Sequence, residues 1–364
     1  MLITGGANSL LNKFQDNQCI ENCDGPASER VHFEQPVFQT AQMFVAEMCC
    51  WFFYLLTKRS VYQPIAEDSP EEGGSVPQPV LRGKKVFLLG LPAVCDIVGT
   101  TLMNVGLLFV PVSIFQMTRG ALVLFVAFFS IVFLKHHITR VQWLGLTSVV
   151  LGVFLVGLSA TFHAKKTNDV TASDSDVPIR TAIQVSGGIF MILFGQIFTA
   201  SQFVLEEHIL GRYSLAPIKV VSWEGSFGTG ITIFGSIIIY IILKMFSLGD
   251  TTSQEMFNLA AATSQVFDNT KLIVAGIFVM LSIASFNFFG LSVTRCLSAT
   301  SRSTIDTCRT LLIWFVSLII GWESFQFLQL VGFGFLVYGT LTFNGVIHNK
   351  QHKEPEEVVV QDHT

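Results

Sequence analysis

The chain has 364 residues, of which 51% are hydrophobic and only 13% are charged, and its mean hydropathy is +0.56. Soluble domains carry about a quarter charged residues, so this composition excludes an ordinary soluble protein and predicts several passes through a lipid bilayer. The net charge of −4 excludes a basic surface for nucleic acid.

The N-terminal apolar stretch is unusually short. Residues 1–12 reach Lys13 after only about a dozen residues, too few to cross about 30 Å of hydrocarbon. A signal peptide is disfavoured because no basic start is present. We therefore expect a first span that has lost its N-terminal half. In the loop that follows, Cys19 and Cys23 could form a disulfide if that loop is lumenal.

Nine further apolar segments have membrane-spanning length. They are expected at about 37–57, 86–108, between Pro111 and Lys135, and at 141–158, 181–205, 217–243, 272–293, 297–320 and 325–347. The Pro/Glu/Gly-rich loop at 58–85 is predicted to be disordered. A hydrophilic linker occupies 161–180 and a polar tail 348–364. An amphipathic piece at 254–267 is predicted to lie on the membrane surface.

Two of these segments are copies of one another. At an offset of 190, residues 113–131 align with 303–321, which pairs Gln116 with Asp306 and Arg119 with Arg309. The following helices match too, because Gly145 and Gly152 are seven apart, as are Gly332 and Gly339. At a looser offset of 194, Asn8 aligns with Gln202. The pattern predicts two five-helix repeats, at 1–160 and 181–347. An odd number of spans in each makes the second repeat inverted.

Loop charge predicts the orientation. With a cytosolic N-terminus, the cytosolic loops carry more Lys and Arg than the opposite loops, so both termini are expected in the cytosol. Arg119 and Arg309 then lie roughly 12–18 Å deep at 1.5 Å per residue, near the midplane where inverted-repeat carriers place their binding sites.

Ionisable residues inside spans usually mark a water-filled pathway. Asp306 and Arg309 could bind substrate, or could form an intrahelical ion pair that only stabilises the span. Arg302 is expected to snorkel toward the headgroups. Arg119 lacks an acidic neighbour three residues earlier, so its charge needs another partner. That partner is either Asp96 or Glu47, or an anionic group of a substrate.

The remaining polar candidates are divided between a cavity and structural roles. Gln116, Gln196, Gln202, Asn287 and Asn344 could line a substrate cavity or serve as interhelical hydrogen bonds. Phe115 and Phe286 lie beside polar candidates.

Acidic residues inside the spans could also bind and release protons during transport. Glu47, Asp96 and Glu224 are candidates for proton coupling. Glu206 and Glu207 are expected to cap the cytosolic end of their span. No catalytic, metal-binding or cofactor-binding motif is evident, so neither an enzyme nor a metal or cofactor site is predicted.

Several segments together resemble a known family. These are the SxFQMxRG motif at 113–120, FVLEE at 203–207, EGSFG at 224–228, FNFFGLSVT at 286–294, LSATSRSTIDTCRT at 297–310 and GWE at 321–323. The set is similar to the drug/metabolite transporter superfamily, and within it to the member-six-like branch of the F subfamily of the solute carrier 35 group. The resemblance implies the EamA-type fold of ten helices, a cytosolic N-terminus and a central cavity.

We therefore expect an all-α, ten-helix membrane protein of two inverted repeats with a truncated first helix. Its predicted function is secondary-active transport of a small organic solute, a nucleotide sugar or other anionic metabolite, by alternating access. The expected location is an endomembrane, Golgi or endolysosome. The alternative is a non-transporting membrane interaction protein that keeps the carrier fold. The expected partners are a small-molecule substrate and the lipid bilayer, and no nucleic acid. A homodimer is possible.

Overall fold

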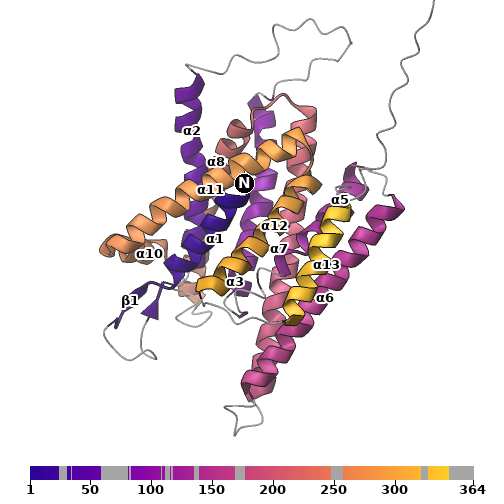
Figure 1. Cartoon of the computed structure of the whole chain (residues 1–364). Coiled ribbons are helices and arrows are strands. Elements are labelled where there is room, and N and C mark those ends of the chain that lie inside the picture. Colours follow the sequence, from indigo (N-terminus) through magenta and orange to yellow (C-terminus); the bar gives the residue numbers. More distant parts are fainter. Residues whose placement is uncertain are drawn as a thin grey trace, which may run out of the picture.

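The computed structural model of the chain is almost entirely helical (Figure 1). It describes residues 1–23, 31–33, 35–58, 81, 83–107, 109–110, 115, 118–134, 139–168, 177–246, 257–320 and 327–343. Gln116, Asn344, most of the 58–85 loop and the 348–364 tail lie outside these residues, so the predictions made for them are not addressed by it.

The described helices follow the predicted spans. Their bounds are α1 Leu2–Asp16, α2 Pro36–Lys58, the 3-10 helix η2 Gly83–Leu89, α3 Gly90–Leu107, α5 Leu122–Leu134, α6 Arg140–Asn168, α7 Val177–Arg212, α8 Pro217–Phe246, α10 Leu259–Asp268, α11 Thr270–Cys296, α12 Ala299–Ile320 and α13 Phe327–Phe343. The short α10 overlaps the C-terminal part of the predicted amphipathic piece at 254–267 and extends one residue beyond it. The predicted linker is helical at both of its ends, because α6 runs to Asn168 and α7 begins at Val177.

Length and composition identify membrane-crossing helices directly. Within the described residues, five segments are long and apolar enough, at Gly83–Leu107, Gln184–Arg212, Pro217–Met245, Thr270–Cys296 and Ala299–Ile320. Large apolar side chains such as Phe128, Phe234 and Ile319 are exposed on outward faces. Broad exposed apolar surface is rare on a soluble monomer and suits a hydrocarbon surrounding. The chain is a multi-pass membrane protein.

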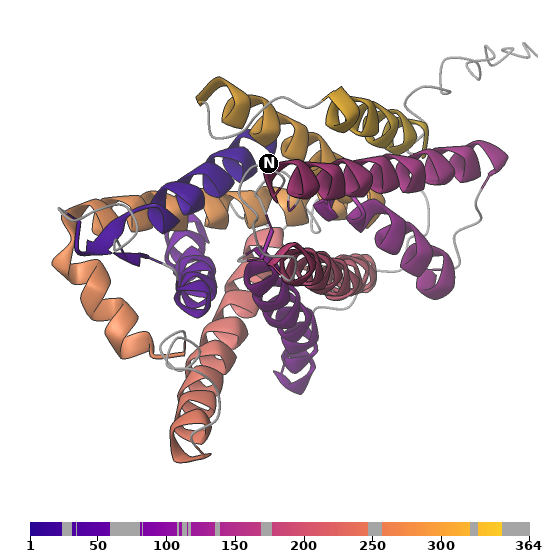
Figure 2. The ribbon, with the colours of Figure 1, turned by 90° about the horizontal axis from the view of Figure 1, so that it is seen from below.

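Glycines set the closest helix packing, between α6 and α13, which lie side by side in Figures 1 and 2. A Cβ added at Gly145 would lie 2.7 Å from the carbonyl oxygen of Gly339. A Cβ added at Gly152 would lie 2.7 Å from the carbonyl oxygen of Gly332. The backbones therefore touch where any side chain would separate them.

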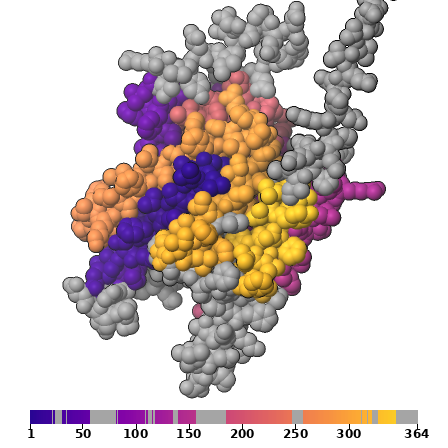
Figure 3. All heavy atoms as spheres, viewed as in Figure 1, coloured from indigo at the N-terminus to yellow at the C-terminus, as the bar shows by residue number. Residues whose placement is uncertain are grey.

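The α3–α7 interface uses the same device. Gly99 faces Gly195, and Gly106 faces Gly188, each opposite the carbonyl oxygen of the other. Elsewhere α2 packs on α8, and α1 packs on α11 and α12. Figure 3 shows this last contact, with the indigo N-terminal residues set among the orange residues of α11 and α12.

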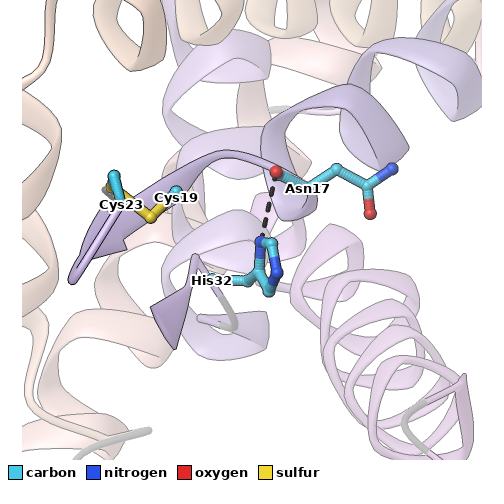
Figure 4. Close-up of a disulfide and its surroundings, with 4 residues drawn as sticks. All are labelled: Asn17, Cys19, Cys23 and His32. Carbon is cyan, nitrogen blue, oxygen red and sulfur yellow. Dashed lines mark hydrogen bonds between the residues drawn. A yellow bond between two sulfur atoms is a disulfide. The ribbon is translucent and has the colours of Figure 1, made fainter. Parts of the chain in front are cut away.

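A small hairpin follows α1. Strands β1 (Cys19–Glu21) and β2 (Val31–His32) pair antiparallel, with Cys19 opposite His32. Cys19 and Cys23 form a disulfide, which confirms the predicted pairing (Figure 4). Nδ1 of His32 lies 3.2 Å from the backbone oxygen of Asn17, which holds the hairpin against the end of α1.

Candidate functional site

A cavity of about 170 Å³ lies among the helices of both halves. Six helices line it, together with Phe115 and Arg119 of the segment before α5. The lining residues come from α1 (Asn8, Ser9, Asn12, Lys13, Asp16), α2 (Gln39, Thr40, Met43), α3 (Asp96, Thr100, Met103, Asn104, Leu107), α7 (Thr199, Gln202, Phe203), α11 (Val279, Ile283, Phe286, Asn287) and α12 (Arg302, Asp306, Arg309).

Three charged side chains meet in the cavity wall. The carboxylate of Asp306 lies 2.9 Å from Nη2 of Arg309, one helical turn away, which confirms the predicted intrahelical ion pair. Its other oxygen lies 3.8 Å from Nη2 of Arg119. Among the described residues, the ion pair of Arg119 is with Asp306 and not with the predicted Asp96 or Glu47, although Asp96 also interacts electrostatically with Arg119. The fold brings α12 to Arg119, a contact that spacing along the chain does not reveal.

Two aromatic rings support the guanidinium groups. The Arg119 guanidinium lies 5.6 Å from the centre of the Phe115 ring, and that of Arg309 lies 4.7 Å from the centre of the Phe286 ring. Such cation–π contacts are worth about 0.5–2 kcal/mol and leave the donor edges free. Nε of Arg119 and Nε of Arg309 are buried and have no hydrogen-bond partner among the described residues. Donors therefore remain for an anionic ligand.

A second ion pair is fully buried. Arg302 is 2% exposed, its Nη1 donates to the carboxylate of Glu206, and its guanidinium lies 3.8 Å from the centre of the Phe203 ring. Nε2 of Gln202 donates to the other Glu206 oxygen at 2.8 Å. The predicted snorkelling of Arg302 is therefore wrong, because a carboxylate inside the protein satisfies its charge.

The adjacent residues Glu206 and Glu207 have different roles. The helix carrying them continues to Arg212 instead of ending at Glu206. Glu207 alone acts as a cap, and it does so for another helix, accepting a hydrogen bond from the backbone N–H of Ala299 at the start of α12 at 3.1 Å. The prediction that Glu206 caps its own span is wrong.

The other predicted residues divide into two groups. Asp96, Gln202 and Asn287 line the cavity, as do Arg119, Asp306 and Arg309. Outside the lining, Gln196 is buried and donates from Nε2 to the sulfur of Met103 at 2.7 Å. Glu47 and Glu224 are also buried behind the wall, where Nδ2 of Asn287 donates to Glu47.

Sequence reasoning missed the polar face of α1. Asn8, Asn12 and Lys13 line the cavity, and Oδ1 of Asn8 accepts a hydrogen bond from Ser282 at 3.1 Å. The offset that aligned Asn8 with Gln202 contained this signal, because Gln202 was already a cavity candidate and both residues line the cavity.

Comparisons with known proteins agree with this geometry. Residues 36–158 match the EamA-like transporter family. An uncharacterized protein of Schizosaccharomyces pombe is 38% identical over 95% of this chain and 96% of its own length. Solute carrier family 35 member F6 of Homo sapiens is 36% identical over 95% of this chain and 87% of its own length.

One solved crystal structure aligns with a TM-score of 0.58 over 96% of both chains. Its sequence identity is 9%, so this is a likeness of fold alone. The near-complete coverage of the sequence relatives confirms the resemblance seen in the motifs. The chain belongs to the solute carrier 35 family, in the branch of its member F6.

Proposed function

We propose that the protein is a secondary-active carrier, not an enzyme, that moves a small organic anion across an endomembrane by alternating access. The observation that carries this proposal is the cavity, whose wall combines Arg119 of the first half with Asp306 and Arg309 of the second. A binding site assembled from both halves opens to one side or the other when the halves rock against each other.

Helix packing supports two inverted five-helix repeats. In the proposed repeat, the helices correspond in chain order: α1 to α7, α2 to α8, α3 to α11, α5 to α12 and α6 to α13. When the two halves are exchanged, the α3–α7 contact therefore becomes the α11–α1 contact. The exchange leaves α2–α8 and α6–α13 unchanged. All four contacts are present.

The glycines obey the same exchange. In this helix an offset of 187, instead of 190, pairs Gly145 with Gly332 and Gly152 with Gly339. The observed contacts join Gly145 to Gly339 and Gly152 to Gly332. Each contact is converted into the other when the halves are swapped, which is the behaviour that a twofold axis between the repeats requires.

The charges favour an anionic substrate. Arg119 and Arg309 share the single carboxylate of Asp306, so this group of three has one excess positive charge, and the Nε atoms of both arginines lack hydrogen-bond partners among the described residues. Guanidinium groups match carboxylate and phosphate oxygens with paired donors. The volume of about 170 Å³ is below the roughly 300–1,000 Å³ typical of sites for drug-sized ligands, which favours a small anionic metabolite over a nucleotide sugar.

The disulfide supports the proposed orientation. Disulfides persist in the lumen of the secretory pathway and are rare in the cytosol. A lumenal position of the Cys19–Cys23 hairpin would agree with a cytosolic N-terminus and with the excess of Lys and Arg in the loops proposed to be cytosolic.

Uptake by purified protein tests the proposal. Proteoliposomes are incubated with a mixture of anionic metabolites, and accumulated compounds are identified by mass spectrometry. We expect one compound class to accumulate with the unaltered chain and not with Arg119→Ala, while Arg140→Ala, an exposed arginine at the start of α6, behaves as the unaltered chain. Correctly folded protein that accumulates nothing above protein-free liposomes would instead support the non-transporting alternative.

A further inference from the structure

Behind the cavity, four carboxylates gather from four different helices. We name the group the acidic cluster; it consists of Glu47 on α2, Asp96 on α3, Glu206 on α7 and Glu224 on α8. All are at least nine-tenths buried. Glu47 and Glu224 each interact electrostatically with the other members of the cluster, and so does Arg302. Arg119 interacts with Asp96 as well, so among the described residues two guanidinium groups face four acids.

The carboxylates of the acidic cluster differ in their hydrogen-bond and ion-pair partners. Arg302 is committed to Glu206 through a direct ion pair. Glu47 accepts a hydrogen bond from the neutral amide of Asn287. Oε1 of Glu224 is buried and has no hydrogen-bond partner among the described residues. An ionised carboxylate in that position costs several kcal/mol, so a cation must neutralise part of this group.

The chemistry favours protons over a metal ion. Within the described residues, no three His, Cys, Asp or Glu side chains are disposed to hold a metal. The charged and titratable groups that face Glu47 and Glu224 are the other members of the acidic cluster, Arg302 and, at Glu47, the thiol of Cys50 on α2. Arg119 and the thiol of Cys95 on α3 face the cluster at Asp96. A proton needs only one oxygen lone pair and converts a carboxylate into a neutral donor.

The cluster also touches the proposed substrate site. Asn287 lines the cavity and donates a hydrogen bond to Glu47. Asp96, a member of the acidic cluster, and Arg302, which interacts with it, also line the cavity. Negative charge arriving in the cavity therefore strengthens proton binding behind it. By reciprocity, bound protons strengthen anion binding.

Resting on the proposed carrier function, we propose that Glu47 and Glu224 reversibly bind protons and that the protein moves protons together with its anionic substrate. Each glutamate takes one proton on the side where the anion enters and releases it on the other side. Asn287 is the positioning residue that joins the pair to the substrate cavity.

Infrared spectroscopy of the purified, lipid-reconstituted protein tests the proton sites without a substrate. The carbonyl stretch of protonated carboxylic acids is followed during a pH titration through neutrality. We expect a band that disappears as pH rises, and a loss of part of its amplitude in Glu47→Gln and in Glu224→Gln. Asp268→Asn, an exposed acid on α10, is the matched control and should keep the full amplitude at neutral pH.

Three results would overturn this inference. One is the lack of a titrating band in the unaltered protein, a measurement that depends on no variant folding. Another is a band that both glutamine variants leave intact. The third is a band removed by sodium chloride at constant pH, which would identify a metal-cation site. Failure of metabolite uptake with a normal titrating band would count against the carrier proposal, and with it against proton cotransport, but not against the proton sites themselves.

Discussion

Arg119 and Asp306 face each other across the junction of the two halves, with 3.8 Å between Nη2 of the arginine and Oδ2 of the aspartate. Asp306 is also bound by Arg309 at 2.9 Å from its own helix. One carboxylate therefore holds two guanidinium groups. Because Arg119 is the more distant and more exposed of the two arginines, it is the one that an entering anion can draw away from Asp306.

The shared carboxylate predicts unequal costs of mutation. Asp306→Ala leaves two cations uncompensated, one of them fully buried, and should reduce the free energy of unfolding by about 3–5 kcal/mol. Arg119→Ala should cost much less, because Asp306 keeps Arg309. Thermal unfolding of the purified variants in detergent measures both costs.

A double-mutant cycle provides the control. The coupling energy between Arg119 and Asp306 should be in the range of about 0.5–3 kcal/mol, typical of contacting residues. The same cycle with Asp96 should give a smaller coupling energy. The opposite order would identify Asp96 as the partner of Arg119 after all.

A second prediction concerns substrate affinity. Arg119→Lys keeps the positive charge but loses the paired donors of the guanidinium and its fit over the Phe115 ring. Uptake of the accumulated compound should require a higher substrate concentration, with unchanged unfolding temperature. Arg140→Lys serves as the matched control. Unchanged uptake in Arg119→Lys would mean that Arg119 serves only as a structural partner.

Much of the fold follows from the sequence because membrane-length apolar runs and an internal repeat are both local patterns. The same repeat identified Arg119, Asp306 and Arg309, all of which line the cavity. Under the proposed inverted repeat, positions that align between the halves lie near one central site, so their convergence does not depend on details of packing.

The buried Arg302–Glu206 pair could not be inferred in this way. Both residues lie near predicted span ends, where charged side chains commonly reach the headgroups. Only the packing of α7 beside α12 and the continuation of α7 to Arg212 carry Glu206 into the interior. The partner of Arg119 was missed for the same reason, because it lies on a helix of the other half.

A third prediction distinguishes the neighbouring glutamates. Glu206→Ala leaves the buried Arg302 unpaired and should reduce the free energy of unfolding by about 3–5 kcal/mol. Glu207→Ala removes only the hydrogen bond to the first turn of α12 and should cost about 0.5–2 kcal/mol, the range of a lost helix cap. Equal costs in thermal unfolding would contradict the assignment of different roles.

A fourth prediction tests the orientation. Single cysteines are introduced into the 59–80 loop, the 348–364 tail and the 247–256 connection, in a background without the other free cysteines. A membrane-impermeant maleimide added to sealed organelles should label the loop and the tail from the cytosolic side. The 247–256 connection should react only after the membrane is opened. Labelling of all three from one side would refute the inverted repeat.

The glycine contacts between α6 and α13 give the last prediction. A methyl group at Gly339 would lie 2.5 Å from the carbonyl oxygen of Gly145 and 2.7 Å from the backbone nitrogen of Val149, two groups that can move only if the helices separate. Gly339→Ala should therefore lower the free energy of unfolding by about 1–3 kcal/mol.

Gly334, on the same helix, has no atom within 4 Å of an added methyl group. Gly334→Ala should be neutral or stabilise the helix by about 0.5–1 kcal/mol. Both substitutions add the same methyl group to one helix, so a lower unfolding temperature for Gly339→Ala than for Gly334→Ala is due to the contact between α6 and α13. Equal unfolding temperatures would show that the two helices are not packed backbone to backbone.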